Sequence, residues 1–518
     1  YNRVDWVSVK AFGAKGDGVT DDTSAISSAA SYVQSNGGTL FFPKGTYLIS
    51  GTIRLDNLTK DLRIVGAGKE TTVILRKSGS VTADHQPIFL IRNADGSSIR
   101  VGIEGLYIDN NARGNPLPDG ASSTEWEHNH SFTLYPRGTR GVQEVTVRNV
   151  TIYDPIADGV SLSGGATDCF GDITITNVNS YNRTRTRSDV CITASFDTFI
   201  ISDSILDALE IETNSVDSSL KHEVIINNVK TKKILDLYLK GGDSLKNEAA
   251  LTNVTCEGSV FLGEFHFKIN NCSFSVDKPI RLVNKSVRFN NCKFYATNLM
   301  NTIHGLLYMT FQTESSLYVH NCEFDADSSL TPTQLPYFIW KEHYYDNTKE
   351  MVISETKFKH SSIPAVYFRS GKHKFFRCEF YANTTNLIQH TTNQAGIDNE
   401  VHCVGNVVHD VNGWLFRPMT LGNVVRFYFK NNESKSMGQI LDLPRFDMIA
   451  SPRENSPYQY WDFKSVDEFE SDAIPTSGKY IRGQIIWNVA PTAGGKIGWV
   501  CVQSGNPGVW KAFGAIDA

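Results

Sequence analysis

A short phrase, an asparagine or in one case an aspartate followed by Val, Ser or Cys, returns along the middle of the chain at intervals of 18 to 30 residues. The asparagines that begin it are Asn149, Asn177, Asn228, Asn253, Asn271, Asn291 and Asn321, and Asp203 fills the gap after Asn177. A β-rich unit recurring at this length is typical of a solenoid, in which each coil packs only on its neighbours. The repeat therefore predicts a parallel β-solenoid, although 518 residues would otherwise indicate three or four domains.

Stacked coils place like residues in ladders about 4.8 Å apart. We therefore expect the asparagine side chains to pair from coil to coil at the turns, and the residue after each asparagine to point inward. A phenylalanine follows two residues after each of four cysteines, and the four pairs are Cys272 and Phe274, Cys292 and Phe294, Cys322 and Phe324, and Cys378 and Phe380. These cysteines are predicted to be small core residues, because the spacing of zinc ligands is absent.

Composition excludes several classes of protein. A net charge of −5 argues against nucleic acid as a partner, and no apolar run is long enough for membrane insertion. The sequence predicts no cofactor and no metal. The chain opens on Tyr1 without a leader sequence, so we expect a processed product or fragment with a part missing upstream.

The first forty residues predict a cover for the open end of the solenoid. Asp21 or Asp22 is placed to cap a helix, in which Ala25, Ile26, Ala29, Ala30 and Val33 form an apolar stripe. A terminal coil would otherwise expose unpaired backbone and core side chains. The glycines and Asp17 fit neither a phosphate-binding loop nor a calcium loop, because the residues that complete those motifs are missing.

Two segments at the start of the chain carry a resemblance to a known family. Phe12-Gly-Ala-Lys-Gly-Asp-Gly-Val-Thr-Asp-Asp and Gly37-Gly-Thr-Leu-Phe-Phe-Pro-Lys-Gly-Thr-Tyr resemble the opening of the pectate-lyase-like superfamily. The resemblance implies a right-handed, single-stranded parallel β-helix, an all-β fold. It is specific for the fold and weak for the reaction.

The end of the chain is similar to the C-terminal segments of phage tailspike depolymerases. Short strands alternate with turns there, and Trp487, Trp499 and Trp510 lie in them. We predict an N-terminal cap with the first coils over residues 1–115, a central β-helix with a polysaccharide-binding groove over 116–445, and a small β domain over 446–518. The small domain is predicted to serve trimerisation or carbohydrate binding.

The two resemblances together imply a tailspike of a bacteriophage virion. Members of that group are homotrimers that bind capsular polysaccharide or O-antigen on a Gram-negative host cell and cut it outside the cell. The part missing upstream would attach this chain to the phage tail.

Hydrolysis of a glycosidic bond needs two carboxyl groups that flank it. Four coils align if Val160, Val190, Leu209 and Leu237 share an inward position. In that alignment Glu210 and Glu212 face outward on one strand, with Asp189 one coil away. Nearby carboxylates raise each other's proton affinity, so Glu210, Glu212 and Asp189 are the predicted catalytic residues. The alternative for each glutamate is a solvated surface charge.

Other residues are predicted to bind the sugar or to compete for the catalytic role. Sugar-binding candidates are Trp126, His128, His130, Arg183, Arg185, Arg187, Tyr238 and Lys240, and Asp158 and Glu264 are the alternative catalytic carboxylates. A buried, hydrogen-bonded histidine is the alternative for either His128 or His130, and a solvated face is the alternative for the arginines.

Two other functions stay open at this stage. One is a polysaccharide lyase, in which β-elimination at a uronic acid would use Arg187, Tyr238, Lys240 or His266. The other is a non-catalytic receptor-binding fibre that grips the polysaccharide without cutting it.

Overall fold

The computed structural model describes residues 5–117, 126–165, 167–181, 188–213, 221–239, 247–283, 286–309, 316–341, 350–360, 362–368, 371–381, 386–391, 399–409, 414–420, 425–430, 433–434, 439–441, 468–476, 480, 482–505 and 507–517. The chain forms two compact units, residues 1–318 with 322–335 and residues 319–321 with 336–518. The division falls within β27 (Leu317–His320).

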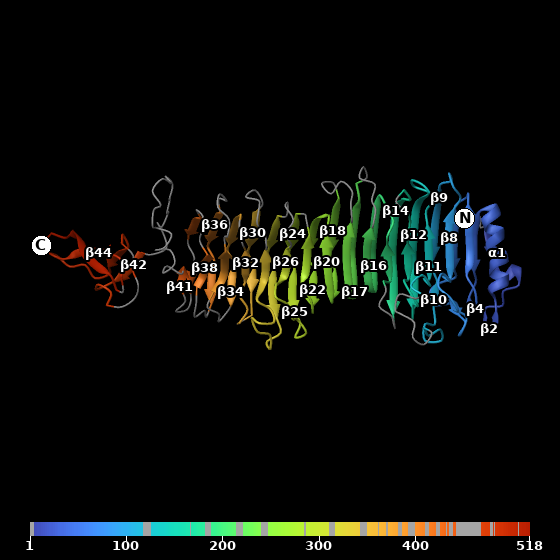
Figure 1. The fold of residues 1–518 in the computed structure, drawn as a ribbon, viewed down its shortest axis with the longest axis horizontal. Helices are drawn as coiled ribbons and strands as arrows, with labels where there is room; N and C mark the ends of the chain where they lie inside the picture. Colours follow the sequence, from blue (N-terminus) through green and yellow to red (C-terminus); the bar gives the residue numbers. More distant parts are fainter. Residues whose placement is uncertain are drawn as a thin grey trace. The chain divides into compact units, whose positions relative to one another are not determined.

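The first unit is a parallel β-helix whose coils follow one another in sequence order (Figure 1). Its strands pair into three stacks. The first stack holds β1 (Trp6–Ser8), β3 (Gly38–Phe42), β6 (Leu62–Gly66), β9 (Ile99–Glu104), β12 (Val142–Tyr153), β14 (Phe170–Tyr181), β16 (Thr198–Thr213), β17 (Glu223–Leu239), β18 (Glu248–Thr252), β21 (His266–Asn270) and β24 (Val287–Asn290).

Long strands turn a corner and belong to more than one stack. The second stack contains the later parts of β12, β14, β16 and β17, with β2 (Asp17–Asp21), β4 (Gly45–Ile49), β7 (Thr72–Arg76), β10 (Tyr107–Asp109), β19 (Thr255–Glu257), β22 (Ser273–Val276), β25 (Lys293–Ala296) and β28 (Glu323–Ala326). The third contains the ends of β16 and β17, with β5 (Ile53–Leu58), β8 (Phe89–Asn93), β11 (Phe132–Tyr135), β13 (Val160–Leu162), β15 (Val190–Ile192), β20 (Ser259–Gly263), β23 (Ile280–Val283) and β26 (Gly305–Met309).

The repeated asparagines form the corner between the first and second stacks. All seven, and Asp203, have φ between 49° and 55°, a left-handed conformation that asparagine and aspartate tolerate better than most residues. Asn177 Nδ2 donates to Asn149 Oδ1 at 2.8 Å, and Asn228 Nδ2 donates to Asp203 Oδ1 at 2.8 Å. The predicted ladder is confirmed, including the substitution of aspartate in one coil.

The predicted core ladder is confirmed as well. Phe294 stacks between Phe274 and Phe324, with ring centroids 5.4 and 4.5 Å away. All nine cysteines are buried and none forms a disulfide. Inward phenylalanine and cysteine thus fill the space behind the asparagine corner.

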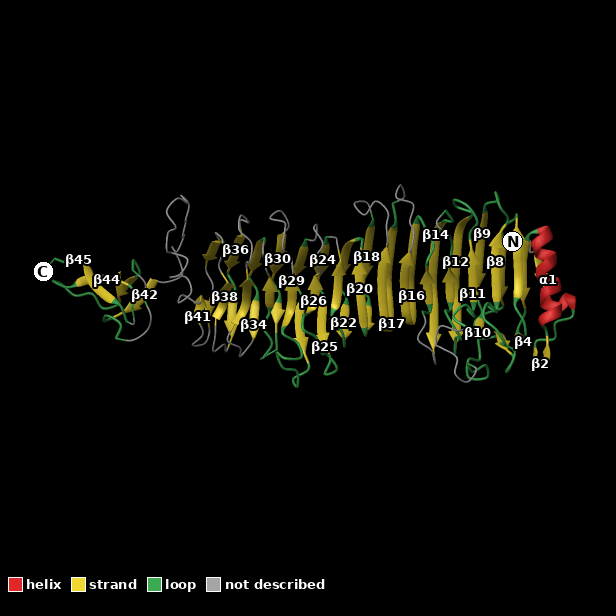
Figure 2. Ribbon diagram, in the orientation of Figure 1, coloured by secondary structure: helices red, strands yellow, loops and turns green. Residues whose placement is uncertain are grey.

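Helix α1 (Thr23–Asn36) covers the first coil next to η1 (Val9–Phe12), and it is the red element at the end of the ribbon in Figure 2. Ile26, Ala29, Ala30 and Val33 are its buried residues, four of the five in the predicted apolar stripe, and the fifth, Ala25, is half-buried. Asp22 stands at the N-cap position, but its carboxylate accepts from the backbone N–H groups of Lys15 and Gly16. Asp21 accepts from the N–H of Thr23 instead.

The second unit contains three parallel runs of strands and a separate sheet. The runs are β29 (Tyr337–Lys341), β32 (Val366–Phe368), β35 (Asn386–Thr391), β38 (Trp414–Thr420) and β41 (Gln439–Leu441); β30 (Glu350–Ser354), β33 (Lys372–Phe376), β36 (Asn399–Val404) and β39 (Val425–Lys430); and β31 (Lys357–Phe358), β34 (Glu379–Tyr381), β37 (Val407–His409) and β40 (Glu433–Ser434). Phe358 and Phe380 continue the inward phenylalanine pattern in this unit, stacked at 5.2 Å.

A four-stranded sheet forms the end of the chain. It consists of β42 (Glu468–Ser471), β43 (Ile485–Asn488), β44 (Lys496–Gln503) and β45 (Val509–Ala515). Trp510 is buried with Ile486 and Cys501, and Trp499 packs against them. The predicted fold class, an all-β parallel β-helix with a capping helix and a small terminal β-sheet, is confirmed. Among the described residues, no helix has the length and apolarity needed to cross a membrane.

Candidate active site

Glu210 and Glu212 lie on the part of β16 that belongs to the third stack. Leu209 and Ile211 beside them are completely buried, whereas Glu210 is half-buried and Glu212 is exposed. Because successive side chains of a strand alternate between its two faces, both glutamates face away from the core. Their predicted outward placement is confirmed.

The next coil does not have the predicted register. Leu209 pairs with Leu235, so Leu237 sits opposite Ile211 and the expected alignment of Leu237 with Leu209 is wrong. Asp236 therefore pairs with Glu210. Leu235 and Leu237 both point inward, and a shift of two residues leaves that pattern unchanged, so alternation cannot distinguish the two registers. The pairing also has an irregularity between Leu206 and Ala208 that adds a residue to β17.

This register creates a carboxyl cluster, made of Glu210, Glu212 and Asp236. Paired residues on neighbouring strands lie about 4.8 Å apart, within reach of each other's charge. Within the described part of the chain, Asp236 Oδ1 is inaccessible to solvent and has no hydrogen-bond partner. Burial, followed by the charges of Glu210 and Glu212, raises the pKa of Asp236 to about 7. Asp236 was not among the predicted catalytic residues, and its outward position next to an acidic strand was the signal for it.

Aromatic and cationic side chains continue the same row on the following coils. Asp236 pairs with Phe261 on β20, and Phe261 pairs with Arg281 on β23. The Tyr238 ring stacks on Phe261 with centroids 5.2 Å apart, and the Arg281 guanidinium carbon lies 5.4 Å from the Phe261 centroid. A Cβ atom at Gly263 would lie 2.7 Å from Tyr238 Cδ2, so glycine leaves the space that this ring occupies.

Tyr238 and Glu264 flank the carboxyl cluster. Burial and then the negative charge of Glu264 raise the pKa of Tyr238, with smaller effects from Asp236 and Glu212. Glu264 has a φ of 64° and is half-buried. The structure thus brings this alternative carboxylate beside the predicted sugar-binding Tyr238.

Asp189 and Asp158 are not on the outer surface, so their expected exposure to substrate is wrong. Asp189 is completely buried, and its carboxylate accepts from Ser180 Oγ at 2.6 Å and from the N–H groups of Asp207 and Ala208. Asp158 is 2% exposed and accepts from the N–H of Ser188 at 3.0 Å. Both stand in the turns that precede third-stack strands, where the alternation of a strand does not apply. Their carboxylates satisfy backbone donors of the coil.

Two predicted sugar-binding residues are buried in the same region. Trp126 is 8% exposed and packs with Val81, Ala112 and Ile156, so its expected place as a surface contact is wrong. His130 is 3% exposed, and its Nδ1 accepts from the N–H of Asp158 at 3.1 Å. The buried alternative therefore holds for His130.

His128 is the accessible member of this group. It lines a cavity of about 240 Å³ at the third stack, whose other walls are Arg54, His85, Pro87, Leu90, Arg92, Thr133 and Tyr135. Thr133 belongs to the row that continues through Ser161 and Cys191 to Glu210. Three strand spacings place the cavity about 14 Å along the stack from the carboxyl cluster.

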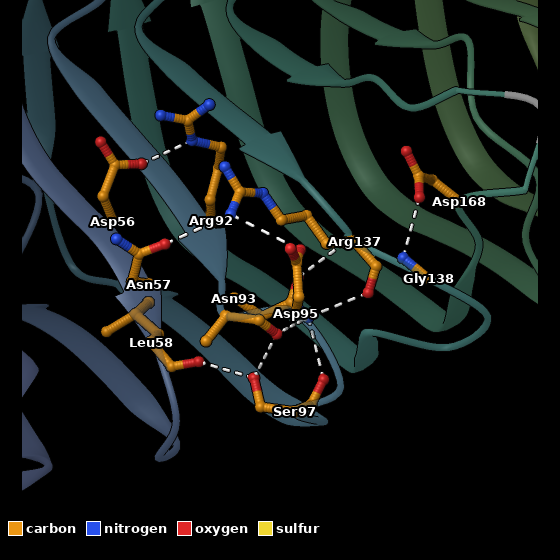
Figure 3. A network of polar contacts seen from close by, with 11 residues as sticks. Asp56, Asn57, Leu58, Arg92, Asn93, Asp95, Ser97, Arg137, Gly138 and Asp168 are labelled. Atoms are coloured by element: carbon orange, nitrogen blue, oxygen red, sulfur yellow. Dashed lines mark hydrogen bonds and ion pairs between the residues drawn. The ribbon is translucent and has the colours of Figure 1, made fainter.

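Polar contacts hold Arg92, one of the two arginines of this cavity, and the neighbouring Arg137 (Figure 3). Arg92 Nε lies 2.5 Å from Asp56 Oδ1, and Arg137 on the following coil contacts Asn57 and Asp95. The other predicted sugar-binding cations, Arg183, Arg185, Arg187 and Lys240, lie outside the described residues.

Comparison with known proteins relates the chain to enzymes and to phage structural proteins. Residues 6–179 match the family model described as rhamnogalacturonase A/epimerase, pectate lyase-like. The chain is 35% identical over 170 residues to alginate lyase 7 of Azotobacter vinelandii, a match that covers 30% of this chain and 18% of that protein. It is 37% identical over 162 residues to the pre-neck appendage protein of Bacillus phage phi29, covering 31% of this chain and 17% of that protein.

The matches therefore span about a fifth of the length of these curated relatives. Among solved structures, the N-terminal fragment of bacteriophage phi29 gene product 12 is 14% identical, with 84% of this chain and 72% of that chain covered and a TM-score of 0.48. The resemblance of the opening segments to the pectate-lyase-like superfamily is confirmed. Residues 6–179 match a pectate-lyase-like family model, in a parallel β-helix protein that is similar over part of its length to phage pre-neck appendage proteins and to an alginate lyase.

Proposed function

We propose that this protein is a phage-associated polysaccharide depolymerase that hydrolyses glycosidic bonds at the carboxyl cluster of the third stack. The observation that carries the proposal is the pairing of Asp236 with Glu210 on neighbouring strands, where burial and then the charges of Glu210 and Glu212 raise the pKa of Asp236 to about 7. A carboxyl group protonated near neutral pH and adjacent to an ionised one is the pair that glycoside hydrolysis requires.

In the proposed reaction Asp236 is the general acid. Its proton passes to the glycosidic oxygen as the bond from that oxygen to the anomeric carbon breaks. Glu210 on the neighbouring strand acts as the ionised partner, which either activates a water molecule or attacks the anomeric carbon. Water supplies the hydroxyl on the anomeric carbon. If Glu210 activates this water, Glu210 takes its proton, and Asp236 regains a proton from solvent as Glu210 releases one; if Glu210 attacks the anomeric carbon, water breaks the bond between Glu210 and the sugar and gives its proton to Asp236.

The residues around the cluster suit a sugar chain laid along the stack. The stacked rings of Tyr238 and Phe261 offer an apolar surface, and aromatic residues commonly supply such contacts in binding sites. Arg281 adds a cation whose planar donors match a carboxylate. We therefore propose an acidic polysaccharide as the substrate, with the reacting bond held near Asp236.

Elimination at a uronic acid is the second candidate, because Tyr238 and Arg281 also lie at this site and an alginate lyase is among the relatives. A tyrosine that acts as base must lose its proton, yet the pKa of Tyr238 is raised by burial and by three carboxylates. This direction opposes the use of Tyr238 as the base.

The similarity to phage pre-neck appendage proteins supports a place on the virion. There the chain would meet host capsular polysaccharide or O-antigen, and we propose that it works as a homotrimer. Light scattering of the intact chain is expected to give three times the chain mass of 57.6 kDa. A monomer mass would contradict the trimer without affecting the proposed chemistry.

A panel of purified capsular and O-antigen polysaccharides from Gram-negative bacteria tests the reaction. We expect new reducing ends with at least one acidic polymer, and mass spectrometry should show fragments that have gained water. Fragments with unsaturated uronic acid ends and ultraviolet absorbance would select elimination instead. Binding of a polysaccharide without any cleavage would select the non-catalytic fibre and overturn the enzyme proposal.

A further inference from the structure

Two histidines and an aspartate meet at the edge of the cavity beside Arg54 and Arg92, away from the carboxyl cluster. Asp84 Oδ2 lies 2.7 Å from His128 Nδ1 and 3.7 Å from His85 Nε2. One potential ligand atom from each of the three residues lies within 4.8 Å of the other two. The two imidazole rings are stacked, with centroids 4.2 Å apart and planes 16° apart.

These spacings are close to those of a bound transition metal. Ligand atoms at about 2.0–2.2 Å from a tetrahedral zinc ion lie about 3.3–3.5 Å from each other. The 3.7 Å between His85 Nε2 and Asp84 Oδ2 is close to that value, whereas the 2.7 Å between His128 Nδ1 and Asp84 Oδ2 is a hydrogen bond, which an ion would replace by moving these two atoms apart. Two imidazoles and one carboxylate suit zinc, nickel, copper or iron, whereas calcium prefers a shell of oxygen atoms.

The backbone around the three residues holds them together before any metal arrives. The N–H of His128 donates to Asp84 Oδ1 at 2.9 Å, and Asn129 Nδ2 donates to the carbonyl of Ala83 at 3.1 Å. His85 has a φ of 59°, a left-handed conformation that histidine adopts more readily than most residues, and it directs the chain between Asp84 and β8.

Charge at the site is compatible with a cation. Asp84 supplies the negative charge of the group, and its Oδ2 now takes part in the hydrogen bond with His128 Nδ1 that a bound ion would replace. The nearby Arg54 and Arg92 both face Asp56, which offsets part of their charge. The side chain of His85 is 69% exposed and that of His128 is 37% exposed, so an ion can enter from solvent.

We propose that Asp84, His85 and His128 form a binding site for a divalent transition metal, with Zn²⁺ as the ion for the test. The ion would link the segment before β8 to the segment before β11, at the open side of the cavity. Its remaining coordination positions would face solvent or an oxygen atom of a bound saccharide. The proposal stands independently of hydrolysis at the carboxyl cluster.

Calorimetric titration of the untagged full chain with zinc chloride tests this site. We expect saturable binding of one ion per chain and a higher melting temperature when zinc is in excess. His85→Asn keeps a residue that tolerates positive φ and removes the imidazole, and His128→Gln removes the second one. Each should weaken zinc binding at least about 10-fold and abolish the zinc-dependent rise in melting temperature.

His320→Asn is the matched control, because it removes an exposed histidine elsewhere on the chain. This variant should bind zinc as the parent chain does. Absence of saturable zinc binding in the parent chain would overturn the proposal. Binding that is equally strong in the His85→Asn and His128→Gln variants would also overturn it, since the ion would then sit at other residues.

Discussion

The third stack holds carboxyl groups in two contrasting settings. Asp158 and Asp189, the turn pair, are buried in turns and accept hydrogen bonds from backbone N–H groups. Asp236 in the carboxyl cluster pairs with Glu210 on a strand, and its inaccessible Oδ1 has no partner among the described residues. Both settings remove carboxyl oxygens from water, but only the turn pair has hydrogen-bond donors that replace the lost water molecules.

The difference separates structural from reactive carboxyl groups better than exposure does. Backbone donors stabilise the ionised form of a carboxyl group, so such a group holds the coil together. A buried carboxyl group without donors and next to like charges keeps its proton to higher pH, and for these reasons the pKa of Asp236 is raised to about 7. A site for acid catalysis can therefore be recognised by buried carboxyl groups that lack hydrogen-bond donors.

Replacement of Asp236 by asparagine should have the largest effect on activity. The amide side chain has the same shape as the carboxyl group but no acidic proton to donate, and loss of a general acid typically costs about 10²–10⁴ in rate. The measurement is kcat/KM on whichever polysaccharide the panel identifies. Glu257→Gln is the matched control, because Glu257 is an exposed second-stack residue that pairs with Lys230, and its activity should stay at the parent level. Near-parental activity of Asp236→Asn would remove this residue from the mechanism.

Replacement of Asp189 by asparagine should show the opposite pattern. In the parent chain the two carboxylate oxygens of Asp189 accept from Ser180 Oγ on one side and from two backbone N–H groups on the other. An asparagine has one accepting oxygen and a donating NH2 group, so one or more of these buried donors lose their partner. Unpaired buried donors cost about 1–3 kcal/mol each, and we expect a loss of about 2–4 kcal/mol in the free energy of unfolding. Thermal melting measures this loss. Normal activity of the protein that remains folded at low temperature would confirm the structural role, whereas unchanged stability would contradict it.

Much of the fold could be predicted because equivalent residues meet the same structural requirement in every coil. Asparagine tolerates left-handed backbone, so the recurrence of Asn149 and Asn177 marks the corner directly. The inward position after it admits only small or apolar side chains, which cysteine satisfies. These requirements are local to each coil and leave a trace in the sequence.

The site could be predicted only in part, because its geometry depends on pairing between coils. Glu210 and Glu212 follow from alternation on one strand. The position of Asp236 depends on the register between β16 and β17. Two registers that differ by two residues give the same pattern of inward hydrophobic residues, so the pattern cannot decide between them. Asp189 was misplaced because it belongs to a turn, where its carboxylate bonds to the N–H of Ala208.

The pH dependence of Asp236 separates its catalytic and structural effects. In the proposed mechanism only protonated Asp236 is active, so kcat/KM should fall about tenfold per pH unit above about 7.

The free energy of unfolding should also depend on the protonation of Asp236, and it should fall as the pH rises. The folded state holds the proton up to about pH 7 and the unfolded chain releases it near pH 3.8, so rising pH between these values disfavours folding. Asp236→Asn should therefore be more stable than the parent chain at pH 8, by up to about 2–4 kcal/mol in the free energy of unfolding, and should melt at a higher temperature. The two should converge near pH 4. An equal difference at both pH values would contradict the raised pKa.

The smallest expected effect concerns the space beside Tyr238. In Gly263→Ala the new methyl group would meet the Tyr238 ring at 2.7 Å, so the ring must move off Phe261. If the stacked rings bind the sugar, KM should rise several-fold while kcat changes less, because the carboxyl cluster itself is untouched. Gly102→Ala is the control, since its methyl group meets only the Arg63 side chain at 3.6 Å, in another stack. A parental KM in Gly263→Ala would show that the substrate lies elsewhere on the stack. The difference between the turn pair and the carboxyl cluster would then concern the carboxyl groups alone and not the aromatic rings beside them.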